Sequence, residues 1–180
     1  MRVIRLDTPQ EGLDVEHLAQ LHHEEFGGSR EFNVEAVTRA CVKCVLDNER
    51  RYFNCWIAYD DKSLPIGYLA ATLSESFYSF RSYAIQEMWY VIPRMRGTRA
   101  GIMLLNAYEG WAIKRDCERI YTQVEHDGAL ALTETIFGML NKLGYRKQGY
   151  IAVKSFQHED KDDDNDRTTH RAMGAQQAQV

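Results

Sequence analysis

The stretch of this sequence best suited to chemistry is a short loop, residues 96–101, in which two glycines stand among cationic and hydroxyl side chains. An apolar, aromatic segment over 86–93 precedes the loop, and apolar residues at helical spacing follow it from Ile102. This pattern predicts a strand, a loop and a helix. A glycine-bearing loop that opens a helix presents free backbone N–H groups and the positive end of the helix dipole. We therefore expect an anion site, most naturally for a phosphate or pyrophosphate.

Two common phosphate-binding motifs do not occur in the sequence. There is no G-x-x-x-x-G-K-[ST], which excludes a P-loop, and no G-x-G-x-x-G, which leaves a dinucleotide fold unsupported. The strand before the loop also carries Glu87 in an otherwise apolar setting. A carboxylate there is costly to bury without a partner or a task, and burial would raise its pKa toward the range useful to a general base. The alternative is that Glu87 faces solvent at a sheet edge or pairs with an arginine.

The remaining elements are predicted from hydrophobic periodicity and turn residues. Strands are predicted over 1–6, 54–59, 65–74, 119–125 and 145–156, and helices over 13–26, 34–48 and 130–143. Asn33 is expected to cap the second helix at its N-terminus, and Gly144 to end the last helix. Residues 75–83 are aromatic and polar, and too irregular to assign.

Length and composition indicate an ordinary globular protein. At 180 residues the chain is expected to form one domain with a sizeable core. No apolar run approaches the ~20 residues of a membrane span, and the N-terminus is too polar for a signal peptide, so a cytoplasmic protein is the default expectation. Residues 158–180 hold six acidic and three basic residues, so they carry −3 of the net charge of −4. We predict a domain over 1–157 and a flexible tail over 158–180, with docking onto a partner subunit as the alternative.

Two other groups of reactive side chains are expected to have structural rather than chemical roles. Cys41 and Cys44 form a C-x-x-C, but no second pair completes a zinc site, so we expect free thiols rather than a redox or metal role, and no metal. The run from His22 to Glu25 looks reactive. Adjacent residues of a helix point apart, however, so this run is expected to be a solvated face rather than a metal site.

The strand–loop–helix stretch resembles motif A of the GCN5-related N-acetyltransferases, the GNAT superfamily. Val91-Ile92-Pro93 stands for V-x-P, and residues 96–101 stand for [QR]-x-x-G-x-[GA], with Arg99 in place of the central glycine. Residues 137–145 resemble the family's terminal motif L-Y-x-K-L-G-F, with Leu140 at the tyrosine position. The resemblance covers about residues 1–156. It implies the GNAT fold, an α+β, three-layer arrangement with a mixed central sheet of six or seven strands, the fourth and fifth splayed, flanked by about four helices.

The resemblance also implies which residues form the site. The main chain of Trp89, Tyr90 and Val91 would pair with the pantetheine of acetyl-CoA like an added strand, and the pyrophosphate would rest on the loop. The loop residues expected to bind the cofactor are Arg96, Gly97, Thr98, Arg99, Ala100 and Gly101. Arg99 must either swing its side chain away or act as an extra phosphate clamp. Glu87 is the expected catalytic base, and His126 or a water could act as the acid.

The function implied is transfer of an acetyl group from acetyl-CoA to a primary amine by direct attack in a ternary complex. The acceptor would be a small molecule or a protein amine, and a homodimer is left open. The alternative is a GNAT-fold protein that binds acyl-CoA or a partner with little catalysis, which Arg99 and Leu140 motivate. A GNAT-type toxin acting on charged tRNA is a third candidate. The near-neutral charge of residues 1–157 argues against that candidate and gives no strong nucleic-acid signal. The aromatic residues of 77–83 would either line the acceptor site or pack at a sheet edge.

Overall fold

The computed structural model describes residues 1–26, 31–46, 52–76, 80–124 and 130–148. The strands are β1 (Arg2–Arg5), β2 (Phe53–Tyr59), β3 (Pro65–Glu75), β4 (Ser82–Val91) and β5 (Arg119–Tyr121). The helices are α1 (Pro9–Phe26), α2 (Val34–Leu46), α3 (Ala100–Lys114) and α4 (Leu130–Lys142), and one 3₁₀ turn, η1 (Pro93–Met95), follows β4.

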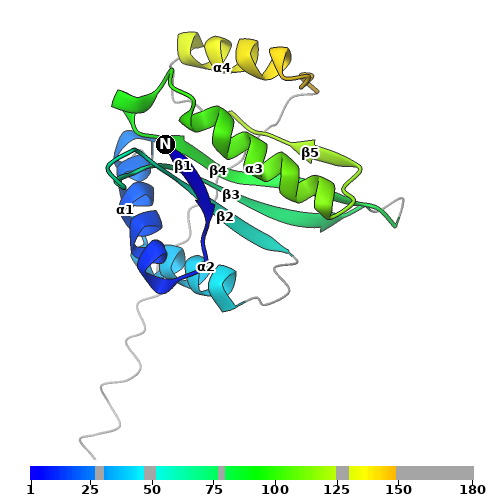
Figure 1. Ribbon diagram of the computed structural model, residues 1–180. Coiled ribbons are helices and arrows are strands. Elements are labelled where there is room, and N and C mark those ends of the chain that lie inside the picture. Colours follow the sequence, from blue (N-terminus) through cyan, green and yellow to red (C-terminus); the bar gives the residue numbers. More distant parts are fainter. Residues whose placement is uncertain (27–30, 47–51, 77–79, 125–129, 149–180) are drawn as a thin grey trace, which may run out of the picture. The chain divides into compact units, whose positions relative to one another are not determined.

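The strands form one mixed sheet in chain order, from β1 to β5 (Figure 1). The first four strands are antiparallel to their neighbours, whereas β5 lies parallel to β4. The described part of the chain contains five strands, fewer than the six or seven expected. The strand predicted over 145–156 is not formed at 145–148, and its other residues lie outside the described part.

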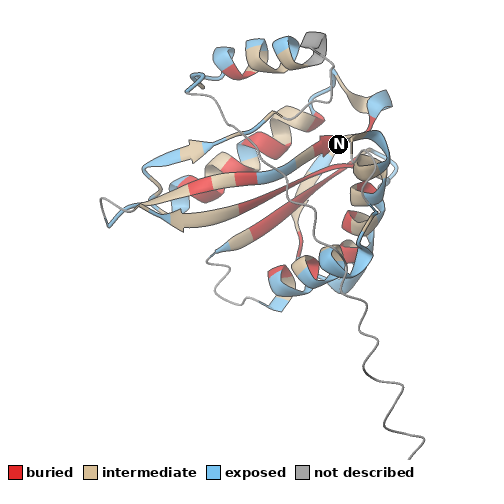
Figure 2. Ribbon diagram, turned by 180° about the vertical axis from the view of Figure 1, so that it is seen from behind, coloured by how far each residue is buried: buried red, intermediate tan, exposed pale blue. Residues whose placement is uncertain are grey.

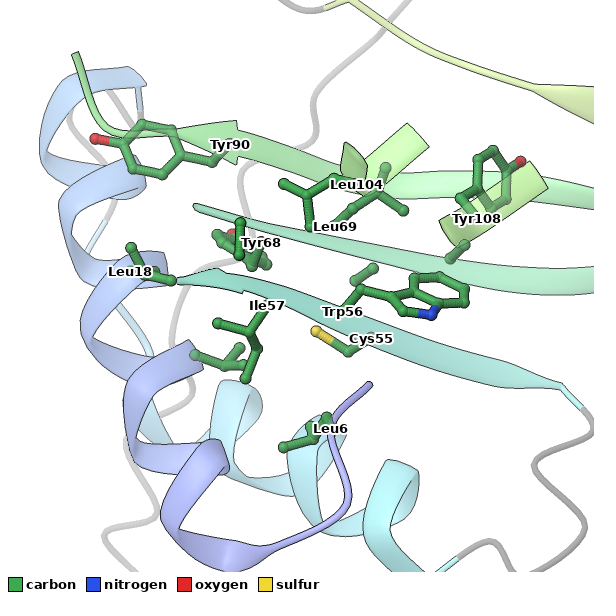
Figure 3. Packing of buried hydrophobic residues seen from close by; sticks show 14 of the residues in the cluster. Leu6, Leu18, Cys55, Trp56, Ile57, Tyr68, Leu69, Tyr90, Leu104 and Tyr108 are labelled. Atoms are coloured by element: carbon green, nitrogen blue, oxygen red, sulfur yellow. The ribbon is translucent and has the colours of Figure 1, made fainter. Parts of the chain in front are cut away.

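Helices cover both faces of this sheet, which confirms the three-layer α+β fold. On one face Trp56 of β2 packs on α3, where the centroid of its ring lies 6.3 Å from that of Tyr108. Tyr68 of β3 and Tyr90 of β4 are cross-strand partners on the other face. Figure 3 shows both tyrosine rings. Each of them contacts His22 of α1.

The core lies between the sheet and its helices, and Figure 2 shows the buried residues on the strands and on the sheet-facing sides of the helices. Three of the four cysteines belong to this core. Cys41 and Cys44 share the buried face of α2, and Cys55 lies on β2. Burial raises the pKa of the Cys55 thiol well above its usual value. The expectation of free thiols is confirmed.

Local signals in the sequence set several helix ends. Thr8 and Glu11 form a reciprocal capping box at the start of α1, in which Glu11 Oε2 accepts from the Thr8 N–H at 2.9 Å. Asn33 Oδ1 accepts from the Ala36 N–H at 2.9 Å, as expected for the cap of α2. Gly144 has a φ of +93°, the left-handed conformation that suits glycine just after a helix.

Residues up to Tyr145 form one compact unit, and residues from Arg146 onward are assigned to a second, of which only 146–148 are described. The predicted boundary at 157/158 and the flexible tail lie outside the described residues and stay predictions. No described helix is both long and apolar enough to cross a membrane.

Candidate active site

The sheet opens between β4 and β5. Pairing of these strands is limited to three residue pairs and ends at Ile85–Tyr121, whereas β4 continues to Val91. The strand predicted over 119–125 is too long, because β5 ends at Tyr121 and residues 122–124 are not in a strand. Residue 125 lies outside the described residues. A β-bulge at Glu87 interrupts the pairing of β4 with β3 just beyond Ile85. A bulge bends and twists a strand, which accounts for the divergence of β4 from β5. The expected splaying of the fourth and fifth strands is confirmed.

The loop after β4 presents backbone donors to the opening. Gly97 has a φ of +79°, a conformation that L side chains rarely adopt, and it turns the chain from η1 toward α3. The first hydrogen bond of α3 runs from the Met103 N–H to the Arg99 carbonyl. Within the described residues, the structure records no acceptor for the backbone N–H groups of Gly97, Arg99, Gly101 and Ile102. These N–H groups and the helix dipole make this helix start suitable for an anion.

Arg99, which stands in place of the family's central glycine, has an unstrained backbone and is exposed. Its backbone is right-handed helical, with φ −72° and ψ −9°, which any L residue adopts without strain. Its side chain is exposed and does not line the cavity described below. The charge of Arg99 acts on Asp61, whose pKa is lowered mainly by the N-terminal ammonium group and secondarily by this guanidinium. The exposed position of Arg99 outside the cavity fits a side chain that swings away, and this stays a prediction.

A cavity of about 330 Å³ follows the free part of β4 and reaches the loop and α4. Eight of the ten predicted site residues line it, and these are Glu87, Trp89, Tyr90, Val91, Arg96, Gly97, Thr98 and Gly101. The other two do not line it, and of these Arg99 is exposed and Ala100 is buried in the core. Gln123 and Val124, which follow β5, and Ile136 and Met139 of α4 complete the opposite wall.

Arg96 is engaged with α1. Its Nη2 donates to Glu25 Oε2 at 2.6 Å, its Nε donates to the Val91 carbonyl at 3.0 Å, and its guanidinium lies over the rings of Phe26 and Tyr90. The hydrogen bond from Arg96 is the main cause that lowers the pKa of Glu25. These contacts of Arg96 hold the loop against the end of α1. Binding of the cofactor by Arg96 stays a prediction.

Glu87 lies at the bulge and is exposed, so of the two interpretations the one with a buried side chain is wrong. Its Oε1 accepts a hydrogen bond from Thr72 Oγ1 of β3 at 2.5 Å. Glu87 is near the mouth of the cavity and remains accessible to a group that enters from solvent. The alternative of a solvent-facing carboxylate describes its position correctly.

His22 and Gln86 are two of the cavity residues that were not predicted. His22 was assigned to a solvated face, but it is half-buried, its ring stacks on Tyr90 with centroids 4.7 Å apart, and its Nδ1 lies 3.0 Å from Tyr68 Oη. Burial is the main cause that lowers the pKa of His22, which favours the neutral imidazole. Gln86, next to Glu87, is only 4% exposed. The sequence could have identified Gln86 as a candidate site residue, because it places a carboxamide in a mostly apolar strand.

No tyrosine hydroxyl of the terminal motif or of α3 faces the cavity as a possible general acid in the described residues. Leu140, at the position of the family's tyrosine, is a core residue with 2% exposure. Tyr145 Oη donates to Glu109 Oε1 at 2.7 Å, and Tyr108 Oη donates to the Tyr121 carbonyl at 3.1 Å. Neither hydroxyl lines the cavity. His126, the other candidate acid, lies outside the described residues.

The match to a protein-family model identifies the class of this protein. The model of the acetyltransferase (GNAT) family matches residues 15–139, about two thirds of the sequence, and the chain belongs to this family. It is accordingly an acyl-CoA-dependent N-acyltransferase. GNAT acetyltransferases use acetyl-CoA or CoA and bind an acceptor. No curated protein sequence matches the chain.

Solved structures agree on the fold. An aminoglycoside acetyltransferase from an uncultured soil metagenomic sample is 18% identical, with a TM-score of 0.65 over 87% of this chain and 98% of that one. A ribosomal-protein-alanine N-acetyltransferase from Brucella melitensis biovar Abortus 2308 is 12% identical, with a TM-score of 0.64 over 87% and 100%. AAC(6')-Iy, solved with a bisubstrate analogue of CoA and acetylneamine, is 12% identical, with a TM-score of 0.65 over 87% and 98%.

Proposed function

We propose that this protein transfers an acetyl group from acetyl-CoA to a primary amine by direct attack in a ternary complex. The observation that carries the proposal is the free part of β4. From Gln86 to Val91 this strand has no β5 partner. The 330 Å³ cavity runs along it to a helix start whose first N–H groups have no acceptor among the described residues. An extended ligand that carries a diphosphate at one end fits such a site.

The diphosphate of the donor would lie on the N–H groups of Gly97, Gly101 and Ile102. Trp89 adds a further donor, because its indole Nε1 is buried without a partner among the described residues and lines the same cavity. A Cβ on Gly101 would lie 3.8 Å from this nitrogen, so the indole edge is next to the loop. The pantetheine arm would then extend along β4 toward the bulge.

Glu87 is proposed as the base that receives the proton of the amine. It is the acidic side chain of the described cavity wall, and its Thr72 hydrogen bond holds one carboxylate oxygen in place. The nitrogen lone pair of the amine attacks the thioester carbonyl carbon, the C–N bond forms and the C–S bond breaks. A backbone N–H of β4 would polarise the thioester carbonyl. The excess proton of the nitrogen passes to Glu87, directly or through water, and the thiolate takes a proton from solvent.

Departure of the thiolate does not require a tyrosine. A thiol is fairly acidic, with a pKa of about 8.5, so its thiolate leaves without a dedicated acid. The position of Leu140 in the core is therefore compatible with turnover. It is also the observation that favours the second candidate, a protein of the same fold that binds acyl-CoA with little catalysis.

Thiol release over a panel of amines tests the proposal and separates the two candidates. We expect acetyl-CoA-dependent thiol release with at least one amine. We expect Glu87→Gln to lower kcat by roughly 10²- to 10⁴-fold with little change in acetyl-CoA affinity. Glu75→Gln is the matched control, because Glu75 is an exposed carboxylate on the neighbouring strand and does not line the cavity. Full activity of Glu87→Gln at every pH would refute its role as the base, and acetyl-CoA binding without thiol release over the whole panel would favour the second candidate.

A further inference from the structure

Gln86 spans the point where β4 and β5 separate. It follows Ile85, the last β4 residue that pairs with β5, and its side chain is 4% exposed. The Nε2 of Gln86 donates to the Gln123 carbonyl, two residues beyond the end of β5, at 3.1 Å. The carboxamide thus bridges the two diverging segments at the end of the gap.

The other end of this carboxamide is unpaired. Gln86 Oε1 is buried and has no hydrogen-bond partner among the described residues, and Gln86 lines the cavity. The orientation of the amide follows from its neighbour, since the Gln123 carbonyl only accepts hydrogen bonds and must face the NH₂ group. A residue of the cavity wall therefore carries a fixed acceptor for which no donor is recorded among the described residues, and a buried acceptor without a donor is unfavourable.

The register of the sheet shows which side of β4 this acceptor serves. Gln86 pairs with Ala71, and Trp89 pairs with Leu69. Ala71 and Leu69 are two residues apart on β3, so the side chains of Gln86 and Trp89 lie on the same face of the sheet. This is the α3 face, because Leu69 also pairs with Trp56, which packs on α3. Glu87 instead reaches Thr72 on the other face. The acceptor oxygen of Gln86 therefore lies on the same face of the sheet as the indole of Trp89. It is this indole that lies next to the loop proposed for the diphosphate.

We propose that Gln86 is a positioning residue that holds the arm of the acyl donor. Its Oε1 accepts a hydrogen bond from the amide N–H of the arm that is nearest the thioester. The proposal rests on acetyl-CoA as the donor. The amide is two carbons from the sulfur, so a hydrogen bond to Gln86 would place the thioester beside the bulge that carries Glu87. Gln123 supports this contact by fixing the carboxamide.

The test combines a protein change with a ligand change. Gln86→Met keeps the length of the side chain and removes the acceptor, and Asn54→Leu is the matched control. Asn54 is also a buried carboxamide without a partner among the described residues. It pairs with Ala71 on the same face of the sheet, but it does not line the cavity. Titration calorimetry measures the affinity of each full-length variant for CoA and for its nucleotide part, 3'-phosphoadenosine 5'-diphosphate.

We expect Gln86→Met to weaken CoA binding by roughly 3- to 10-fold and to bind the nucleotide part as the wild type does. Asn54→Leu should bind both ligands like the wild type. A CoA analogue with oxygen in place of the amide nitrogen nearest the thiol completes a double-mutant cycle. This analogue should bind the wild type more weakly than CoA does, and Gln86→Met should not distinguish it from CoA. If Gln86→Met fails to fold, the wild type alone still provides a test, because equal affinity of the wild type for CoA and for the analogue would overturn the inference.

Three results would overturn the inference. The first is unchanged CoA affinity in Gln86→Met. The second is an equal loss for the analogue in both proteins, which would place the N–H on another acceptor. The third is a higher KM for the amine with unchanged CoA affinity, which would place Gln86 at the acceptor. Failure of the wild type to bind CoA at all would instead refute the proposed function, so the two failures are distinguishable.

Discussion

Gly67 of β3 offers a sharp test of the packing beneath the site. It pairs with Val91, the last residue of β4 before the loop, and a Cβ built on it would lie 2.6 Å from the Tyr90 carbonyl oxygen. It would also lie 3.1 Å from Val91 Cγ2. Ordinary contacts are about 3.5 Å, so Gly67→Ala must push the two strands apart by roughly half an ångström or more. The obstacle is backbone, which no change of rotamer can move.

We expect Gly67→Ala to lower the free energy of unfolding by about 2 kcal/mol, within the range typical of overpacked cores. For a chain of this size the loss corresponds to a fall in Tm of roughly 4–8 °C. Gly110→Ala is the matched control, because a Cβ there meets no atom within 4 Å and the glycine lies inside α3. Alanine in that helix should stabilise the protein by roughly 0.5–1 kcal/mol.

Scanning calorimetry of the two variants and the wild type measures this difference, and urea unfolding provides a second estimate of each free energy. The displaced Tyr90 and Val91 also line the cavity, so Gly67→Ala should bind CoA more weakly, whereas Gly110→Ala should bind it normally. A Tm of Gly67→Ala at or above that of the wild type would refute the close approach of β3 and β4. Equal losses in both variants would refute the assignment of the effect to this contact.

Three further predictions concern the cavity and its surroundings. Arg99→Ala should change CoA affinity by less than about twofold, since an exposed charge that points elsewhere contributes little. Trp89→Phe removes the unpaired indole N–H and should weaken the binding of CoA and of its nucleotide part alike, by roughly 3- to 10-fold. His22→Asn retains a hydrogen-bonding group near Tyr68 and should reduce the loss of stability in acid. Because burial lowers the pKa of His22, the unfolded state binds the proton more readily, and stability is lost as pH falls below about 6.5.

Each of these predictions has a distinct check. A loss of CoA affinity in Arg99→Ala beyond about tenfold would identify the side chain as a phosphate clamp, with a cost closer to that of a desolvated charge. Trp111→Phe is the control for Trp89→Phe, because the Trp111 indole N–H is also buried and unpaired among the described residues but lies outside the cavity. Calorimetric Tm values of wild type and His22→Asn between pH 8 and 5 should diverge on the acid side. Parallel curves would contradict the buried, neutral imidazole.

Much of the fold could be predicted because its signals are local. The V-x-P segment, the glycine-bearing loop and the apolar spacing after Ile102 lie within one continuous stretch, and each reports the conformation of its own neighbours. The structure has the strand, loop and helix there in that order. Asn33 and Gly144 likewise act within one helical turn, and both caps are formed as expected.

The errors concern features that depend on distant parts of the chain. The short β5 results from the divergence of β4 and the bulge at Glu87, which are properties of strand register rather than of residues 119–125. The assignment of His22 to a solvated face failed because helical periodicity cannot show that α1 crosses Tyr68 and Tyr90. Glu87 was placed correctly on its strand, but the direction of its side chain depends on the same bulge.

The backbone amide resonances of the isotope-labelled full-length protein test the central claim most directly. On titration with acetyl-CoA, we expect the N–H signals of Gly97, Gly101 and Ile102 to shift most strongly, together with those of the free part of β4 from Gln86 to Val91. The nucleotide part alone should shift the loop signals and leave Gln86 nearly unchanged. Acetyl-CoA binding that leaves the loop signals in place, or the absence of binding at millimolar acetyl-CoA, would contradict the account.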